Sequence, residues 1–241
     1  MPEPDYLATI EREGAELLAV ARHGPLSAAV TACPGWVLAD LLWHVAEVHD
    51  FWGTVVRERL QDPSVYVQPE RPAEPDLIGF AGERLDRLLD ALRTTDPSTP
   101  VWTWSARKDA GFVRRRMAHE TAVHRVDAQD AIGTALPIDG ELASDGIDEF
   151  LEHFTADVIV GELPLAGSVH LHCTDVPGEW LVRPDGDSLV LTREHAKGDA
   201  AVRGAAHDLL MVLWRRAPLS SVDVIGDAGV AGQLVRRTNL D

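Results

Sequence analysis

The spacing of apolar residues changes once along the chain, near Gly161, and this change constrains the fold more than any other feature. Before it, apolar residues recur at intervals of three and four, which is typical of amphipathic helices. Gly24-Pro25, Asp62-Pro63 and Gly133 mark helix ends. The pattern predicts helices over residues 5–22, 37–60, 76–93, 110–132 and 141–160. We therefore expect an all-helical domain over residues 1–160.

After Gly161 the apolar residues alternate instead. The segments SVHLHCTD and EWLVRPDGDSLVLTRE are rich in β-branched residues, and Asp185-Gly186 predicts a hairpin turn. AAVRG predicts another short strand, and residues 205–215 and 228–237 predict helices. We expect a small α+β domain over residues 161–241. The predicted fold class is thus a helical bundle followed by a small α/β C-terminal domain.

Charge limits the kinds of partner. The 22 Lys and Arg oppose 39 Asp and Glu, a net charge of −17, which disfavours nucleic acid and anionic membranes. The longest apolar runs are too short to cross a bilayer, and MPEPDYLATIEREG has no apolar signal segment. Cys33 and Cys173 form no disulfide framework, so reduced thiols are expected. These features predict a cytoplasmic protein that acts on small molecules.

The segment MAHETAVHRVD, residues 117–127, concentrates groups that bind metals. On a helix of about 100° per residue, His119 and His124 point about 140° apart, so they do not share a metal. Glu120 and His124 lie four residues apart, on one face. That face also carries apolar residues at helical spacing and ends in Asp127, so it is predicted to point into the bundle.

A second helix carries a similar polar interruption. Here His44 lies within an apolar stripe of helical spacing: Val37, Leu41, Val48, Phe51 and Val55. His44, Glu120 and His124 together would supply three ligands from two helices, the number that an open zinc site requires. Asp40 and Asp127 are spaced to orient the two histidines.

Each of these residues also has a structural interpretation. A histidine in an apolar stripe is commonly a hydrogen-bonded core residue, and a Glu-x-x-x-His pair is commonly a surface pair. Several other polar residues are interpreted as structural. His119 and Arg125 are expected on flanking or solvated faces, His49 at the periphery, and His170 and His172 on an exposed strand face. Arg116 lies at the edge of the Glu120 face and would be placed to meet an anion.

Two segments, CPGWVLADLLWHVAEVHDFW and RRRMAHETAVHRVDAQDAIG, resemble the two signatures of the mycothiol-dependent maleylpyruvate isomerase family. The later segments ELASDGIDEFL, PGEWLV and HDLLMVLWRRAPL are similar to the rest of that family's chain. The resemblance implies a DinB-like four-helix bundle that carries a divalent metal, usually zinc, and a small α/β domain. His44, Glu120 and His124 correspond to the family's metal ligands. The family commonly shows Trp-Gly-Arg, whose arginine faces the substrate, where this chain has Trp214-Arg215-Arg216.

The resemblance implies a zinc-dependent enzyme that uses mycothiol as a low-molecular-weight thiol cosubstrate. The expected activity is an isomerase or S-transferase in which the metal activates the thiol for attack on a small electrophile. Maleylpyruvate-type cis-trans isomerisation is the model reaction, and Arg216 would hold a substrate carboxylate. Two alternatives are a metal-dependent hydrolase that uses zinc-bound water and a non-catalytic metal-binding regulatory protein. Three protein ligands argue against the latter, because structural zinc sites normally have four.

Overall fold

The computed structural model describes residues 4–155, 165–186 and 188–237, and these fall into two compact units. One unit spans Asp5–Pro137 and is called the bundle unit here. The other begins at Ile138 and is called the sheet unit. In the described residues, no helix is both long enough and apolar enough to cross a membrane.

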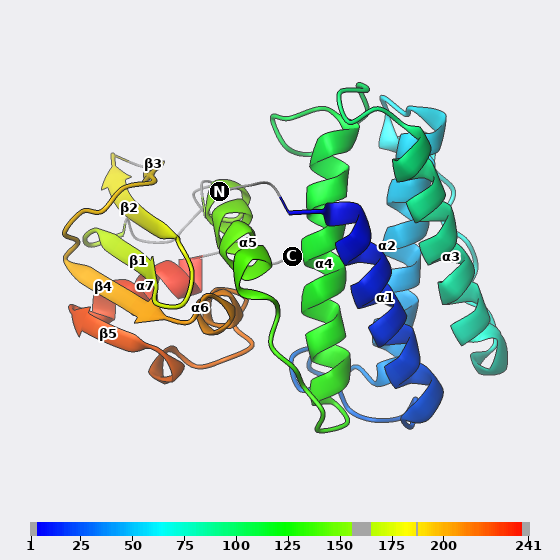
Figure 1. The fold of residues 1–241 in the computed structure, drawn as a ribbon, viewed down its shortest axis with the longest axis horizontal. Helices are drawn as coiled ribbons and strands as arrows, with labels where there is room; N and C mark the ends of the chain where they lie inside the picture. Colours follow the sequence, from blue (N-terminus) through cyan, green and yellow to red (C-terminus); the bar gives the residue numbers. More distant parts are fainter. Residues whose placement is uncertain (1–3, 156–164, 187, 238–241) are drawn as a thin grey trace. The chain divides into compact units, whose positions relative to one another are not determined.

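The bundle unit consists of four helices, which confirms the predicted bundle (Figure 1). Their bounds are α1 (Tyr6–His23), α2 (Leu38–Glu58), α3 (Glu74–Thr94) and α4 (Ala110–Asp130), with a short 3-10 turn η1 (Pro63–Val65). Each lies within two residues of its predicted bounds. Side chains of Asp5 and Asp109 accept hydrogen bonds from Ala8 N and Phe112 N and so cap α1 and α4.

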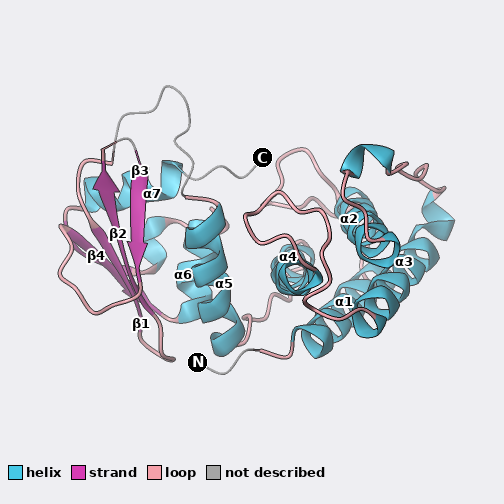
Figure 2. Ribbon diagram, turned by 90° about the horizontal axis from the view of Figure 1, so that it is seen from above, coloured by secondary structure: helices cyan, strands magenta, loops and turns pink. Residues whose placement is uncertain are grey.

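The bundle is arranged as pairs of neighbouring helices. Helix α2 packs along α3, and α1 packs along α4; Figure 2 shows the four helices from one end. Gly14 of α1 permits one close approach, because a Cβ at this position would lie 2.6 Å from Leu85 Cδ2 of α3. Fully buried leucines and valines from α2, α3 and α4 fill the centre: Leu41, Leu42, Val55, Leu88 and Val113.

The described residues of the sheet unit form five strands and three α-helices. Its elements are α5 (Gly140–His153), β1 (Val169–Cys173), β2 (Glu179–Asp185), β3 (Ser188–Thr192), β4 (Ala200–Gly204), α6 (Ala206–Leu213), η2 (Leu219–Ser221), β5 (Asp223–Gly226) and α7 (Ala228–Arg237). The strand order is β3-β2-β1-β4-β5, with β1 and β4 parallel and the other pairs antiparallel. The predicted hairpin is present, since Asp185 pairs with Ser188 and Gly186 has φ +61°. Strand β5 was not predicted.

The two faces of the sheet differ. Val169, Leu171 and Cys173 of β1 alternate toward the side on which α5 lies, because a Cβ at Gly178 would touch both Cys173 Sγ and Ser144 Oγ of α5. Trp180 of β2 faces the same side and donates through Nε1 to Asp148 of α5 at 2.9 Å. The residues between them on β1, His170 and His172, therefore face the other side.

The division between the units lies earlier than the division expected at residue 160. Helix α5 was assigned to the helical domain, but it belongs to the sheet unit, where it packs against α6. Its Ser144 hydroxyl donates to Pro177 O at 2.8 Å, and Asp148 accepts from Trp180. Helical periodicity shows that α5 is a helix and cannot show which unit its apolar stripe covers. The end of the predicted helix, residues 156–160, lies outside the described residues.

Candidate metal centre

His44 of α2 and Glu120 and His124 of α4 converge on one point of the bundle unit. Glu120 Oε1 lies 3.4 Å from His44 Nε2 and 3.2 Å from His124 Nε2. One donor atom of each residue lies within 4.8 Å of the other two. The side chain of His124 is 9% exposed, Glu120 19% and His44 32%, so the cluster opens to solvent beside His44. The structure thus brings together the three ligands predicted from the sequence.

Asp127 orients the imidazole of His124. Its Oδ2 lies 2.9 Å from His124 Nδ1, which leaves Nε2 directed toward Glu120. Burial disfavours the charged imidazole, but hydrogen bonds to Asp127 and Glu120 outweigh it and raise the pKa of His124 to about 9. The role expected of Asp127 matches this geometry.

Arg116 fixes the other end of Glu120. Its Nη2 donates to Glu120 Oε2 at 2.5 Å, and its side chain is buried. Burial raises the pKa of Glu120, while Arg116 and then the two histidines lower it, and the net result is well below the ordinary value. The anion that Arg116 meets is therefore Glu120 itself. Because Oε2 is held by the guanidinium, Oε1 is the oxygen that faces both imidazoles.

Asp40 has a different role from the one predicted. Its Oδ2 accepts from Val37 N at 3.0 Å, and its Oδ1 accepts from Arg71 Nη1 at 2.7 Å. The backbone hydrogen bond, followed by the one from Arg71, lowers the pKa of Asp40. Both carboxylate oxygens of Asp40 therefore accept hydrogen bonds at the start of α2. Asp40 is a capping residue, and the expectation that it orients His44 is not supported by its contacts.

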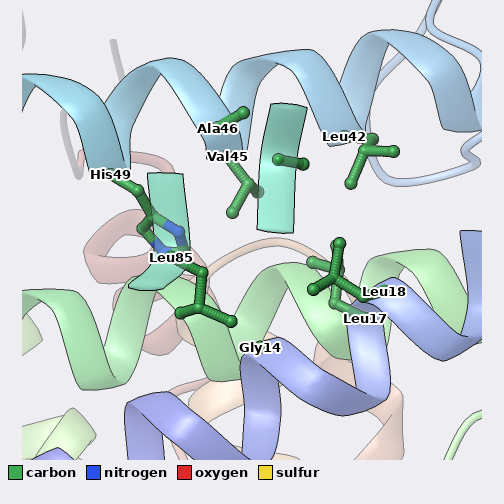
Figure 3. Close-up of a pocket in the computed structure, with 9 residues that line it drawn as sticks. Gly14, Leu17, Leu18, Leu42, Val45, Ala46, His49 and Leu85 are labelled. Carbon is green, nitrogen blue, oxygen red and sulfur yellow. The ribbon is translucent and has the colours of Figure 1, made fainter. Parts of the chain in front are cut away.

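His49, expected at the periphery, is buried beside the cluster. Thr121 Oγ1 donates to Met117 O at 2.6 Å, so it accepts a hydrogen from His49 Nε2 at 2.9 Å. Burial lowers the pKa of His49 to about 4 and keeps the ring neutral at pH 7. Figure 3 shows His49 beside a small cavity that is otherwise lined by apolar residues of α1, α2 and α3. This apolar space offers no polar group except His49 to orient a substrate.

His119 and Arg125 are also buried, although they were expected on flanking or solvated faces. Arg125 Nε donates to Glu13 Oε2 of α1 at 2.7 Å, and its Nη1 donates to Gln129 Oε1 at 2.9 Å and to Leu136 O at 2.5 Å. The His119 ring packs edge-on against Tyr6 of α1, with 6.2 Å between centroids. Most residues of α4 are buried, and its polar residues Arg125 and His119 contact α1.

Arg216 lies in the sheet unit, just after α6. Its backbone N donates to Met211 O at 2.8 Å, and its Nη1 donates to Trp214 O at 2.9 Å. Arg215 has φ +58°, a left-handed backbone conformation that favours glycine.

The three donor atoms fit a divalent transition metal. Two imidazole nitrogens and one carboxylate oxygen are ligands that zinc takes in open sites. The edge of a tetrahedral zinc site is roughly 3.3 Å, and the two distances to Glu120 Oε1 are 3.2 and 3.4 Å. Asp127 binds His124 Nδ1 and Arg116 binds Glu120 Oε2, and these are the atoms that would point away from the metal. The cluster therefore has the donors, spacing and support of such a site.

Family models match both units of the chain. The model for the mycothiol maleylpyruvate isomerase N-terminal domain matches residues 7–129, and the C-terminal domain model of the same family matches residues 141–233. No curated protein matches the chain in sequence.

Solved structures agree with the family models on the fold. A crystal structure of the mycothiol-dependent maleylpyruvate isomerase covers 93% of this chain and 93% of its own, with a TM-score of 0.63 and 14% identity. The structure of a histidine-to-alanine mutant of that isomerase gives the same values. At this identity the likeness shows the fold alone. The two family models together cover most of the chain, which belongs to the mycothiol-dependent maleylpyruvate isomerase family.

Proposed function

We propose that this chain is a zinc-dependent, mycothiol-using enzyme, an isomerase or an S-transferase, with His44, Glu120 and His124 as the metal ligands. The observation that carries the proposal is the convergence of these three donors from two helices at a partly exposed point. Family membership supports mycothiol as the thiol and a small electrophile as the substrate. A zinc ion with three protein ligands keeps one open position and lowers the pKa of a thiol that occupies it.

The chain's own residues prepare the site. Asp127 holds His124 so that its Nε2 faces inward, and Arg116 holds Glu120 so that its Oε1 does. Neutral His49 donates to Thr121, which lies next to Glu120 in α4, and adds no charge to the cluster. The exposed edge of His44 supplies the side from which a thiol reaches the ligands.

We propose that the nucleophile is an external thiol and not Cys173. Burial raises the pKa of Cys173 to about 12, so this side chain is not a nucleophile at neutral pH. In isomerisation, the thiolate sulfur of mycothiol adds to one carbon of an activated cis double bond and leaves a carbanion at the other. The former double bond, now single, rotates, and elimination of the thiolate returns the trans product. In S-transfer, the carbanion takes up a proton instead, and the new C–S bond is kept. A guanidinium binds a carboxylate through two parallel hydrogen bonds, and this is the role proposed for Arg216.

A hydrolase would need a general base beside the metal. Asp127 is 1% exposed and bound to His124, and both oxygens of Asp40 are bound to Val37 and Arg71. These contacts favour the thiol chemistry over hydrolysis. A non-catalytic regulator is disfavoured by the three-ligand count.

The test is a metal assay followed by a thiol titration. Purified protein is expected to contain zinc at this site, and His44→Ala and His124→Ala are expected to lose it, whereas His23→Ala, an exposed histidine outside the cluster, is expected to keep it. Mycothiol added to the cobalt-substituted chain should produce thiolate-to-metal absorbance and release about one proton. Metal content unchanged in both cluster variants would refute the site, and metal binding without thiol binding would refute the proposed activity.

A further inference from the structure

The sheet unit contains a second cluster of potential metal ligands on the face of the sheet opposite α5. His170 and His172 come from β1, Glu179 from β2 and His195 from the loop between β3 and β4. One donor atom of each lies within 4.8 Å of the other three.

The backbone register places three of these residues together. His170 and His172 are two apart on β1, so they share a face. His172 lies directly opposite Glu179 in the antiparallel pairing of β1 with β2. Side chains at opposed positions on one face are in contact range. His195 then packs over His170 edge-on, with 5.5 Å between ring centroids.

Glu179 lies at the centre of the cluster. Its Oε1 is 2.7 Å from His172 Nδ1, and its Oε2 is 2.7 Å from His195 Nδ1 and 3.5 Å from His170 Nε2. One carboxylate thus faces three imidazole nitrogens from two further segments. Of the three contacts, only the one with His195 Nδ1 has hydrogen-bond geometry.

Two of these nitrogens are buried without a hydrogen bond. One is Nε2 of His170, a residue that is 7% exposed. The other is His172 Nδ1, whose short contact with Glu179 lacks hydrogen-bond geometry. A buried polar atom without a partner costs free energy, and native structures contain few of them. Both nitrogens lie beside the carboxylate of Glu179, and the closeness of these donor atoms indicates a ligand that both would bind.

The donor set selects the kind of ligand. Three imidazoles and one carboxylate suit zinc, cobalt, nickel or copper, whereas magnesium and calcium favour sites built from oxygen. Four protein donors would complete a tetrahedral zinc coordination and leave no open position, which is typical of structural sites. We propose that His170, His172, Glu179 and His195 form a closed divalent transition-metal site that ties the loop of residues 193–199 to the sheet.

The proposal does not depend on the proposed function, and the test keeps the two sites apart. The full chain carrying His44→Ala and His124→Ala is titrated with Zn²⁺ in competition with a chromophoric chelator. We expect it to bind one zinc, with affinity lowered at least about tenfold by His195→Ala and by Glu179→Gln. His23→Ala serves as the matched control and is expected to change nothing. The side chain of His195 is 83% exposed, so its removal uncovers the His170 ring but leaves the core of the sheet unit unchanged.

The same substitutions in the otherwise unaltered chain are expected to lower its zinc content by one per chain. Failure of the parent to bind zinc, or unchanged affinity in both His195→Ala and Glu179→Gln, would overturn the proposal. Equal competition by Mg²⁺ would overturn the choice of metal.

Hydrogen exchange gives a second measurement. Ion pairs among these residues would not make the exchange of the loop depend on zinc. Zinc should slow the exchange of backbone amides in residues 193–199 of the parent, and the effect should be absent in Glu179→Gln. Zinc binding that leaves this loop's exchange unaltered would contradict the structural role.

Discussion

Two aspartates near the candidate ligands show how little spacing alone determines about a residue. Asp127 lies three residues after His124 and bonds to its Nδ1. Asp40 lies four residues before His44, on the same helical face, yet it bonds to Val37 N and Arg71. The difference arises because Asp40 is in the first turn of α2, where free backbone N–H groups compete for its carboxylate.

This contrast predicts different effects of two matched substitutions. Asp127→Asn should weaken metal binding by about 10- to 100-fold, because the amide no longer fixes the imidazole or supports its basicity. Asp40→Asn should leave metal affinity unchanged and alter only stability, by about 1 kcal/mol or less, because the amide oxygen can still accept from Val37 N and the lost ion pair with Arg71 is partly exposed. Chelator competition measures the first effect and urea unfolding the second. Equal losses of metal affinity would contradict these assignments.

The raised pKa of His124 makes metal binding dependent on pH. Without metal the imidazolium persists up to a pKa of about 9, and a metal must displace its Nε2 proton. Apparent affinity should therefore fall about tenfold for each unit of pH decrease below 9. Calorimetry in buffers of different ionisation enthalpy should detect about one proton released per metal at about pH 7.5. Asp127→Asn should release less, because it removes one of the partners that raise the pKa.

The raised pKa of His124 also affects the stability of the metal-free protein, which should decrease as the pH rises. The pKa of His124 rises from 6.5 to about 9 on folding, so its contribution to stability is complete below pH 6.5 and is lost as the pH rises through 9. Urea midpoints of the chelator-treated chain should therefore fall between pH 6.5 and pH 9. A midpoint that rises over this interval would show that other groups dominate.

At the scale of elements, most helices and strands were predictable because each has one buried face. Helices α1, α2 and α3 begin and end close to the bounds that their apolar stripes predict. Helix α4 was found, but its surroundings were not, since it is buried on nearly every side and its polar residues Arg125 and His119 bind α1. An amphipathic pattern identifies only the apolar face that points inward. A second buried face made of paired polar residues has the same sequence pattern as a solvent-exposed face.

The strands show the same limit. Alternation identified β1 and correctly placed His170 and His172 on one face, but that face was expected to be exposed. His170 is buried because Glu179 and His195 close over it from other segments. Strand β5 was missed because a four-residue strand is too short for alternation to distinguish it from a loop.

The end of α6 offers a test at this scale. Arg215 follows Trp214, the C-cap of α6, in a left-handed conformation with φ +58°, and its side chain donates to Val235 O and Arg236 O of α7. Arg215→Ala keeps the backbone strain and loses these bonds, whereas Arg215→Gly loses the bonds but removes the strain. The glycine variant should be more stable than the alanine variant by about 1 kcal/mol. Urea unfolding of the two variants measures the difference, and a more stable alanine variant would contradict the prediction.

At the scale of the whole molecule, the division into units follows the hydrogen bonds between buried polar side chains. Glu13, Arg125 and Gln129 form a buried polar group, and Arg125 also binds the carbonyls of Leu136 and Pro137. The chain leaving α4 is thus held by the bundle itself. The sequence predicted two parts but placed their division later, because the composition changes at the first strand rather than at the last bundle contact.

This arrangement predicts that the bundle unit folds without the sheet unit. A fragment spanning residues 5–137 should unfold cooperatively and bind one zinc through His44, Glu120 and His124. Circular dichroism during thermal unfolding and a zinc titration provide the measurements. A matched fragment that ends at residue 133 loses the Leu136 and Pro137 carbonyls and should be less stable. Equal stability of the two fragments would show that Arg125 does not depend on the exit segment.

The position of Arg125 has a consequence for how such a chain changes over evolution. Because its bonds are made before Ile138, a recombination event just after Pro137 would leave Arg125 with Glu13 and with the carbonyls of Leu136 and Pro137. The bundle could then acquire a new C-terminal domain without losing the buried contacts of Arg125.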